Sequence, residues 1–220
     1  MKRITIIICI LFSLTSCEIQ YDGETKIAVT GKIIDQNGNP IPNKNVDITI
    51  YSEDMYTPSD LISFGKSDQN GNFTLIFPAP KVDYKFSISI NQINQTSEFQ
   101  SKEIIAKKTN FENYKLDLNN ITLYKNESIT TLKLILNKTS TNKQLTDIKI
   151  EGEQTDNYID LNPNTEQNNP DYLDTYYNVI KNQTIVLKYT TIDHSNSSSP
   201  TVHSVSIPIV NDAVTYTITY

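Results

Sequence analysis

The chain has 220 residues with 19 basic and 25 acidic side chains, so its formal net charge is −6 at neutral pH. An acidic chain without a run of basic residues argues against binding to nucleic acid and against electrostatic adhesion to anionic lipid. The composition is rich in β-branched residues, tyrosine and asparagine, and no window shows a sustained apolar repeat of 3.6 residues. These features predict an all-β protein.

The first 17 residues have the parts of a secretory signal peptide. Lys2 and Arg3 form a cationic start, an apolar run covers residues 4–14, and small residues precede Cys17. A membrane-spanning helix needs roughly 20 apolar residues, about twice the length of this run. We therefore expect a cleaved peptide rather than a retained transmembrane anchor. Its removal leaves 17 basic against 25 acidic residues.

The end of this segment, Leu14-Thr15-Ser16-Cys17, resembles the lipobox of bacterial lipoproteins. The resemblance implies that Cys17 becomes the first residue of the mature protein, with diacylglycerol on its thiol and an acyl chain such as palmitate on its amino group. One acyl chain holds a protein on a membrane only reversibly, whereas two or three hold it stably. The expected localisation is the outer membrane, with a soluble body attached through the lipid on Cys17.

Residues 18–24 are expected to form a tether. Its acids Glu18, Asp22 and Glu24 resemble the surface-export signals of some lipoproteins of Bacteroidota, but a solvated linker explains them equally well, so the periplasmic and the cell-surface face both stay open. Cys9 lies within the signal peptide and Cys17 is used by lipid, which leaves no disulfide. Stability must then come from core packing.

Alternating apolar and polar residues predict half-buried strands throughout residues 25–125. The five letters Asp-Gln-Asn-Gly-Asn occur twice between such strands, at residues 35–39 and 68–72. Asn-Gly supplies positive φ, so both copies predict tight hairpins. They could also be interpreted as calcium loops, but Pro40 and Phe73 stand where an EF-hand needs glycine.

The same residues resemble the carboxypeptidase regulatory-like domain. The resemblance is carried by residues 29–35, by residues 38–42, and by Asp68, Gly71 and Phe73 within the second copy of the turn. It implies a transthyretin-like β-sandwich over residues 25–125. The matching residues occupy turn and core positions, so the resemblance implies architecture more strongly than activity. Hydroxyisourate hydrolases share that fold, but they need arginines, and this chain has none after Arg3.

Further strands are predicted in residues 126–220, where alternating apolar residues continue. The last two of them, on either side of Asn211 and Asp212, are expected to form a terminal hairpin, and Pro208 indicates an edge strand or a bulge. This half is expected to form a second small antiparallel β-sandwich, for which an immunoglobulin-like arrangement is one option. The fold prediction is thus two antiparallel β-sandwich domains.

Residues 151–177 form the longest irregular stretch and are dense in acids and tyrosines. A tyrosine face beside carboxylates suits a sugar or a peptide, although a solvated loop or bound calcium explains the same composition. Two carboxylates could also serve a glycosidase if they lay about 5 to 9.5 Å apart. The candidate ligand-binding residues are Tyr158, Asp160, Asp171, Tyr172, Asp174 and Tyr176.

The two histidines, His194 and His203, give no convincing catalytic or metal signal. Asp193-His194-Ser195 contains the letters of a catalytic triad, but consecutive residues cannot form the relayed hydrogen bonds that a triad needs. Two histidines without cysteine make a poor zinc site. We therefore expect no catalytic residue, no metal and no cofactor.

The working hypothesis is an envelope-anchored lipoprotein that acts as a noncatalytic binding or accessory module. Its partners would be the membrane, through the lipid on Cys17, and an envelope protein or a glycan. One alternative is a carbohydrate-active hydrolase with carboxylates on residues 151–177. A second alternative is a purely structural envelope spacer.

Overall fold

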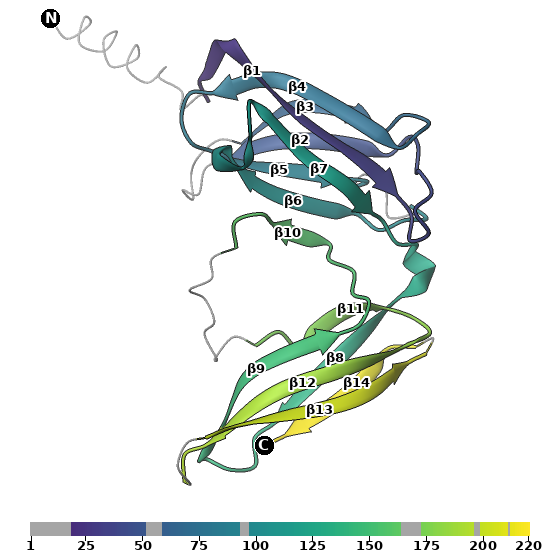
Figure 1. Cartoon of the computed structure of the whole chain (residues 1–220), viewed down its shortest axis with the longest axis vertical. Coiled ribbons are helices and arrows are strands. Elements are labelled where there is room, and N and C mark those ends of the chain that lie inside the picture. Colours follow the sequence, from purple (N-terminus) through teal and green to yellow (C-terminus); the bar gives the residue numbers. More distant parts are fainter. Residues whose placement is uncertain (1–18, 52–58, 93–96, 164–172, 196–198, 211) are drawn as a thin grey trace, which may run out of the picture. The chain divides into compact units, whose positions relative to one another are not determined.

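The structure is a computed structural model that describes residues 19–51, 59–92, 97–163, 173–195, 199–210 and 212–220 (Figure 1). The described residues form fourteen strands, β1 to β14, and two short 3-10 turns, η1 (Lys108–Asn110) and η2 (Asn126–Ser128). The predicted all-β class is confirmed. Among the described residues, no helix is both long and apolar enough to cross a membrane.

The strands divide into two compact units. Unit 1 consists of the described parts of residues 1–93, 101–122 and 158–162, and unit 2 consists of the described parts of residues 94–100, 123–157 and 163–220. Residues 158–162, which the sequence assigns to the second domain, thus lie in unit 1. Each unit contains two separate sheets.

Unit 1 pairs a three-stranded sheet with a five-stranded sheet. The smaller sheet has the order β4 (Asn72–Pro80), β1 (Tyr21–Ile34), β7 (Lys115–Thr122). The larger sheet has the order β10 (Tyr158–Asp160), β6 (Lys102–Lys107), β5 (Lys85–Ile90), β2 (Asn45–Tyr51), β3 (Asp60–Lys66).

The core of unit 1 lies between these sheets, because alternate residues of β2 and β4 are buried, whereas β5 is buried at nearly every position. Phe77 on β4 and Phe86 on β5 come from opposite sheets, and their ring centroids lie 6.1 Å apart. Phe111 packs on the other side of Phe86 at 5.0 Å. The predicted alternation along β1 and β2 is confirmed by the fully buried Val29, Ile48 and other members of the same faces.

Unit 2 contains two three-stranded sheets. One has the order β11 (Tyr176–Ile180), β8 (Ile129–Asn137), β14 (Val214–Thr219), and the other has the order β13 (Pro200–Ile209), β12 (Gln183–Asp193), β9 (Lys143–Glu151). A separate apolar core lies between them and includes Leu132, Leu187 and Ile218. Pro208 lies on β13, which is an edge strand, as the sequence predicts.

The two units share one topology. In each unit the first strand lies in the middle of its three-stranded sheet and pairs in parallel with the strand that completes that sheet, β1 with β7 and β8 with β14. Strands β8, β9, β11, β12, β13 and β14 occupy the places that β1, β2, β4, β5, β6 and β7 hold in unit 1. Unit 2 has no counterpart of β3 among its described residues. The strand at that position in the sequence, β10, pairs in parallel with β6 of unit 1.

The two Asp-Gln-Asn-Gly-Asn segments form the same turn. The Asp35 carboxylate accepts the amides of Asn37 and Asn39, each at 2.8 Å. The Asp68 carboxylate accepts the equivalent amides of Asn70 and Asn72, also at 2.8 Å. These bonds satisfy donors within the turn, which agrees with a structural role rather than with calcium binding.

The hairpin pairings expected around these turns and at the C-terminus are wrong. β3 and β4, which flank the second turn, belong to opposite sheets, and so do β1 and β2 around the first. β13 and β14 are likewise in different sheets. Alternation shows that a strand buries one face, but it does not say which neighbour completes the backbone hydrogen bonds.

Replacing the turn glycines with alanine tests this packing. Gly38 and Gly71 are equivalent, with φ of 83° and 78°. A Cβ at Gly38 meets no atom, whereas one at Gly71 collides with the backbone oxygen of Ile33. We expect Gly38→Ala to cost about 1 kcal/mol from left-handed strain, and Gly71→Ala about 3 kcal/mol because backbone must move. Denaturant unfolding of the full chain measures the free energy of unfolding of each variant. Equal decreases in the two variants would contradict the close contact between Gly71 and the backbone of Ile33.

Candidate functional site

The structure places four of the predicted site residues, and they belong to different units. Tyr158 and Asp160 lie on β10 in unit 1, whereas Asp174 and Tyr176 lie in unit 2. Cys17, Asp171 and Tyr172 lie outside the described residues. Residues 151–177 therefore do not form one continuous loop, because β10 interrupts them.

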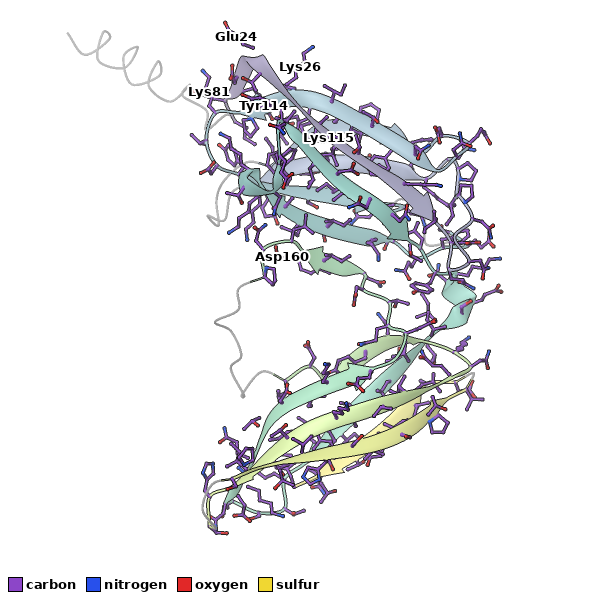
Figure 2. The ribbon with its side chains drawn as sticks, in the orientation of Figure 1. Glu24, Lys26, Lys81, Tyr114, Lys115 and Asp160 are labelled. Carbon is purple, nitrogen blue, oxygen red and sulfur yellow. The ribbon has the colours of Figure 1, made fainter. Side chains whose placement is uncertain are left out.

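The β10 segment is held in unit 1 by its own polar groups. Leu161 donates its amide to the carbonyl of Ile105 at 2.9 Å. The Asp160 carboxylate accepts the backbone amide of Asn162 at 2.8 Å. The side-chain Nδ2 of Asn162 in turn donates to Oδ1 of Asn110 at 2.6 Å. Asp160 thus stabilises a turn at the end of the strand (Figure 2).

Tyr176 is an exposed aromatic residue of unit 2. It begins β11, is directly opposite Lys133 on β8, and keeps 62% of its surface exposed. The Lys133 ammonium lies 5.4 Å from the centre of the Tyr176 ring. A cation at this distance is attracted by the electrons of the ring face and limits the motion of the tyrosine.

The next residue, Tyr177, points the other way. It packs against the core of unit 2, and its hydroxyl donates to the carbonyl of Asp174 at 2.8 Å. Burial, together with the charges of Asp174 and Asp147, raises the pKa of Tyr177 to about 12. Alternation along β11 therefore gives one anchoring tyrosine and one tyrosine available to a partner.

Tyr176 belongs to an exposed sheet face of β11, β8 and β14 that carries no acid. We call this surface the threonine face. Parallel pairing sets β14 beside β8, so that Thr215 is opposite Lys133 and Thr217 is opposite Ile135. In a chain with a net charge of −6, a face with one cation and no carboxylate is distinctive. Its exposed residues are Lys133, Ile135, Asn137, Tyr176, Asn178, Thr215, Thr217 and Thr219.

Sequence reasoning found Tyr176 but missed the rest of the threonine face. The alternation Thr215-x-Thr217-x-Thr219 was a usable signal for a row of hydroxyls on one side of a strand. The neighbours of that row could not be inferred, because β8 and β14 are far apart in the chain and pair in parallel.

The histidines have local structural partners. The Asp193 carboxylate accepts the hydroxyl of Ser195 at 2.5 Å and its amide at 2.9 Å, and these bonds lower the pKa of Asp193. His194 instead faces the side chain of Gln144. His203 stacks on Tyr189 with ring centroids 4.6 Å apart. No relay through His194 exists in this arrangement, and the described part of the chain contains no cluster of His, Cys, Asp or Glu suited to a metal.

Comparisons with known proteins do not assign a family. No family model and no curated protein matches the chain. Among solved structures, the shaft pilin SpaA of Lactobacillus rhamnosus GG is 10% identical, with a TM-score of 0.32, over 89% of this chain and 98% of the pilin. The 3-chlorocatechol 1,2-dioxygenase of Rhodococcus opacus 1CP is 16% identical, with a TM-score of 0.33, over 49% of this chain and 61% of the enzyme.

A 9R-lipoxygenase from Cyanothece is also similar, at 20% identity and a TM-score of 0.29 over 54% of this chain. This chain matches only 20% of the lipoxygenase and 61% of the dioxygenase. TM-scores this low support no inference from those proteins to this one.

The buried phenol of Tyr177 predicts a pH-dependent loss of stability. In the unfolded chain a tyrosine ionises near pH 10, whereas the folded value is about 12. The contribution of Tyr177 to stability is therefore constant below pH ~10 and falls as the pH rises toward ~12, because over this range the unfolded chain releases the proton more readily than the folded chain. Between pH ~10 and ~12 the free energy of unfolding of Tyr177→Phe should fall by about 1 kcal/mol less than that of the wild type, a figure that allows for solvent screening at a half-buried site. Urea unfolding against pH measures the difference, and parallel profiles would refute it.

Proposed function

We propose that this chain is a noncatalytic binding or accessory module held at the bacterial cell envelope by lipid on Cys17. The lipobox-like segment ending at Cys17 supports the anchor. Unit 1 begins with β1 at Tyr21, so only a short tether separates the folded body from the modified cysteine. The proposed location is the outer membrane of a member of Bacteroidota, on its periplasmic or its outer face.

We further propose that the threonine face is the binding surface and that it binds a glycan. The observation that carries this proposal is the exposed Tyr176 ring, positioned by Lys133 within a sheet face that has no acid. Sugar rings stack on the apolar face of a tyrosine, and threonine hydroxyls and asparagine amides both donate and accept hydrogen bonds to sugar hydroxyls. A carboxylate-free surface also suits a neutral or an acidic polymer.

The alternatives receive less support. A glycosidase needs two carboxylates about 5 to 9.5 Å apart, and the Asp160 carboxylate already accepts a hydrogen bond from the amide of Asn162 in its own turn. A pure spacer needs no exposed aromatic residue or isoleucine, whereas Tyr176 and Ile135 are 62% and 44% exposed on one face.

Truncating the exposed tyrosine tests the binding surface. Tyr176→Ala removes the stacking ring without disturbing the core, so we expect about tenfold weaker binding to whichever member of an immobilised glycan panel the full chain retains. Tyr158→Ala is the matched control, because Tyr158 is an exposed strand tyrosine of unit 1 and should leave affinity unchanged. Retention of no glycan, or equal affinity of wild type and Tyr176→Ala, would reject a glycan site on the threonine face.

The anchor is tested separately. Cys17→Ala removes the only thiol that can carry diacylglycerol at the proposed cleavage site, so the protein should accumulate uncleaved or leave the outer-membrane fraction. Mass spectrometry of the N-terminal peptide and membrane fractionation measure the two effects. Unchanged retention of Cys17→Ala in the outer membrane would refute lipid anchoring.

A further inference from the structure

Unit 1 contains a cavity of about 740 Å³ at the end where β1 begins. Its walls come from the start of β1, the end of β4 and the segment between β6 and β7. Ile27 and Ala79, each only 7% exposed, provide apolar wall. Phe111 adds an aromatic surface whose position is fixed by its packing on Phe86. The interior is therefore suited to an apolar group, and every lining residue belongs to unit 1.

Two lysines line the same cavity. Lys81 and Lys108 are exposed, and within the described parts of the chain neither side chain forms a hydrogen bond or an ion pair. The one lining acid is Asp22, whose carboxylate accepts the Thr25 hydroxyl at 2.6 Å and the amide of Glu24 at 3.0 Å. These hydrogen bonds and, to a smaller extent, the charge of Lys81 lower the pKa of Asp22, so Lys81 already interacts weakly with this carboxylate. The cavity thus combines an apolar wall with two exposed ammonium groups and one carboxylate that is held by its own turn.

The turn before β7 places a tyrosine beside these lysines at a conformational cost. Glu112 and Lys115 exchange both backbone hydrogen bonds at 2.9 Å, which leaves a two-residue turn made of Asn113 and Tyr114. Their φ values are 49° and 66°. Asparagine tolerates this left-handed region and glycine is favoured at the second position, whereas a bulky residue there is strained by about 1 kcal/mol.

Burial does not offset this strain, because Tyr114 is 67% exposed. It lines the cavity together with Lys81, and Figure 2 shows both residues at the same end of unit 1. Glu24 lies at that end too (Figure 2) but does not line the cavity. The Tyr114 carbonyl accepts the amide of Ala28 at 2.9 Å, which holds the turn against β1, but this bond does not require a tyrosine side chain. Strained residues held by their surroundings are frequent at ligand sites.

We propose that this cavity binds a small anion with an apolar body, namely an organic phosphate or carboxylate. The apolar body lies against Ile27 and Phe111, Tyr114 covers it at the opening, and the anionic group pairs with Lys81 and Lys108. The anion is either the headgroup of a membrane lipid or a soluble metabolite, and these two sources share the same chemistry. The site does not depend on the threonine face, which belongs to unit 2.

Phenyl phosphate is a suitable probe because it is soluble and has both an aromatic ring and a phosphate. The full chain is reconstituted in phosphatidylcholine nanodiscs and titrated by calorimetry. We expect saturable binding of phenyl phosphate and at least about tenfold weaker binding of inorganic phosphate and of benzyl alcohol, each of which keeps only half of the interactions. Nanodiscs that also contain phosphatidylglycerol should displace the probe if a lipid headgroup is the occupant, and should leave its binding unchanged if the occupant is soluble.

Substitutions assign the binding to the cavity. The double variant Lys81→Gln with Lys108→Gln should bind phenyl phosphate about tenfold more weakly, whereas the control pair Lys66→Gln with Lys138→Gln, two exposed lysines elsewhere, should bind as wild type. Tyr114→Gly should weaken binding while raising the melting temperature, because it removes both the ring and the strain. A purely structural tyrosine would not give opposite changes. No saturable binding of phenyl phosphate, or equal affinity in wild type and the Lys81/Lys108 variant, would overturn the proposal.

Discussion

Each unit depends on the parallel pairing of its first strand with a strand far along the chain. β1 and β8 are the central strands of their three-stranded sheets, and their second neighbours, β7 and β14, follow only after most other strands of the unit. Because these pairs join distant parts of the chain, closing them costs loop entropy that only the completed core repays. The two cysteines both lie in residues 1–17, so no disulfide supports this closure in the described body. The interlocked apolar faces between the two sheets must therefore supply the stability of each unit.

The repeated topology has one exception, β10, which follows β9 in the chain but pairs within unit 1. In unit 1, β3 extends the edge of β2, but the segment that follows β9 extends β6 instead. The chain before and after residues 158–162 belongs to unit 2. Consequently, no single cut in the chain would release one unit intact. The pairing also covers the free edge of β6, which would otherwise offer unpaired backbone groups to another chain.

The two proposed binding surfaces differ in chemistry and come from different units. The threonine face offers one tyrosine, hydroxyls and amides on an exposed sheet face, which suits an extended polymer held by many weak contacts. The cavity of unit 1 offers apolar walls and two lysines, which suits one small anion. The threonine face consists of the outward-pointing residues of β11, β8 and β14. The cavity lies beside the strained Asn113-Tyr114 turn, where the strand pattern is interrupted.

Local patterns in the sequence were enough to predict the all-β class, the positions of most strands and the two aspartate-centred turns, because alternation and turn chemistry act over a few residues. They also put Tyr176 among the candidate binding residues. The folded chain was needed to show that the strands flanking each turn join opposite sheets, that β10 pairs outside its own half of the chain, and that Asp160 and Asp174 lie in different units. Lys81 follows β4, whereas Lys108 and Tyr114 lie in the connection between β6 and β7, and no local pattern indicated that these two segments meet at one cavity. The physical reason is that sheet partners are chosen by burial and backbone hydrogen bonding across the whole domain, which a local pattern does not encode.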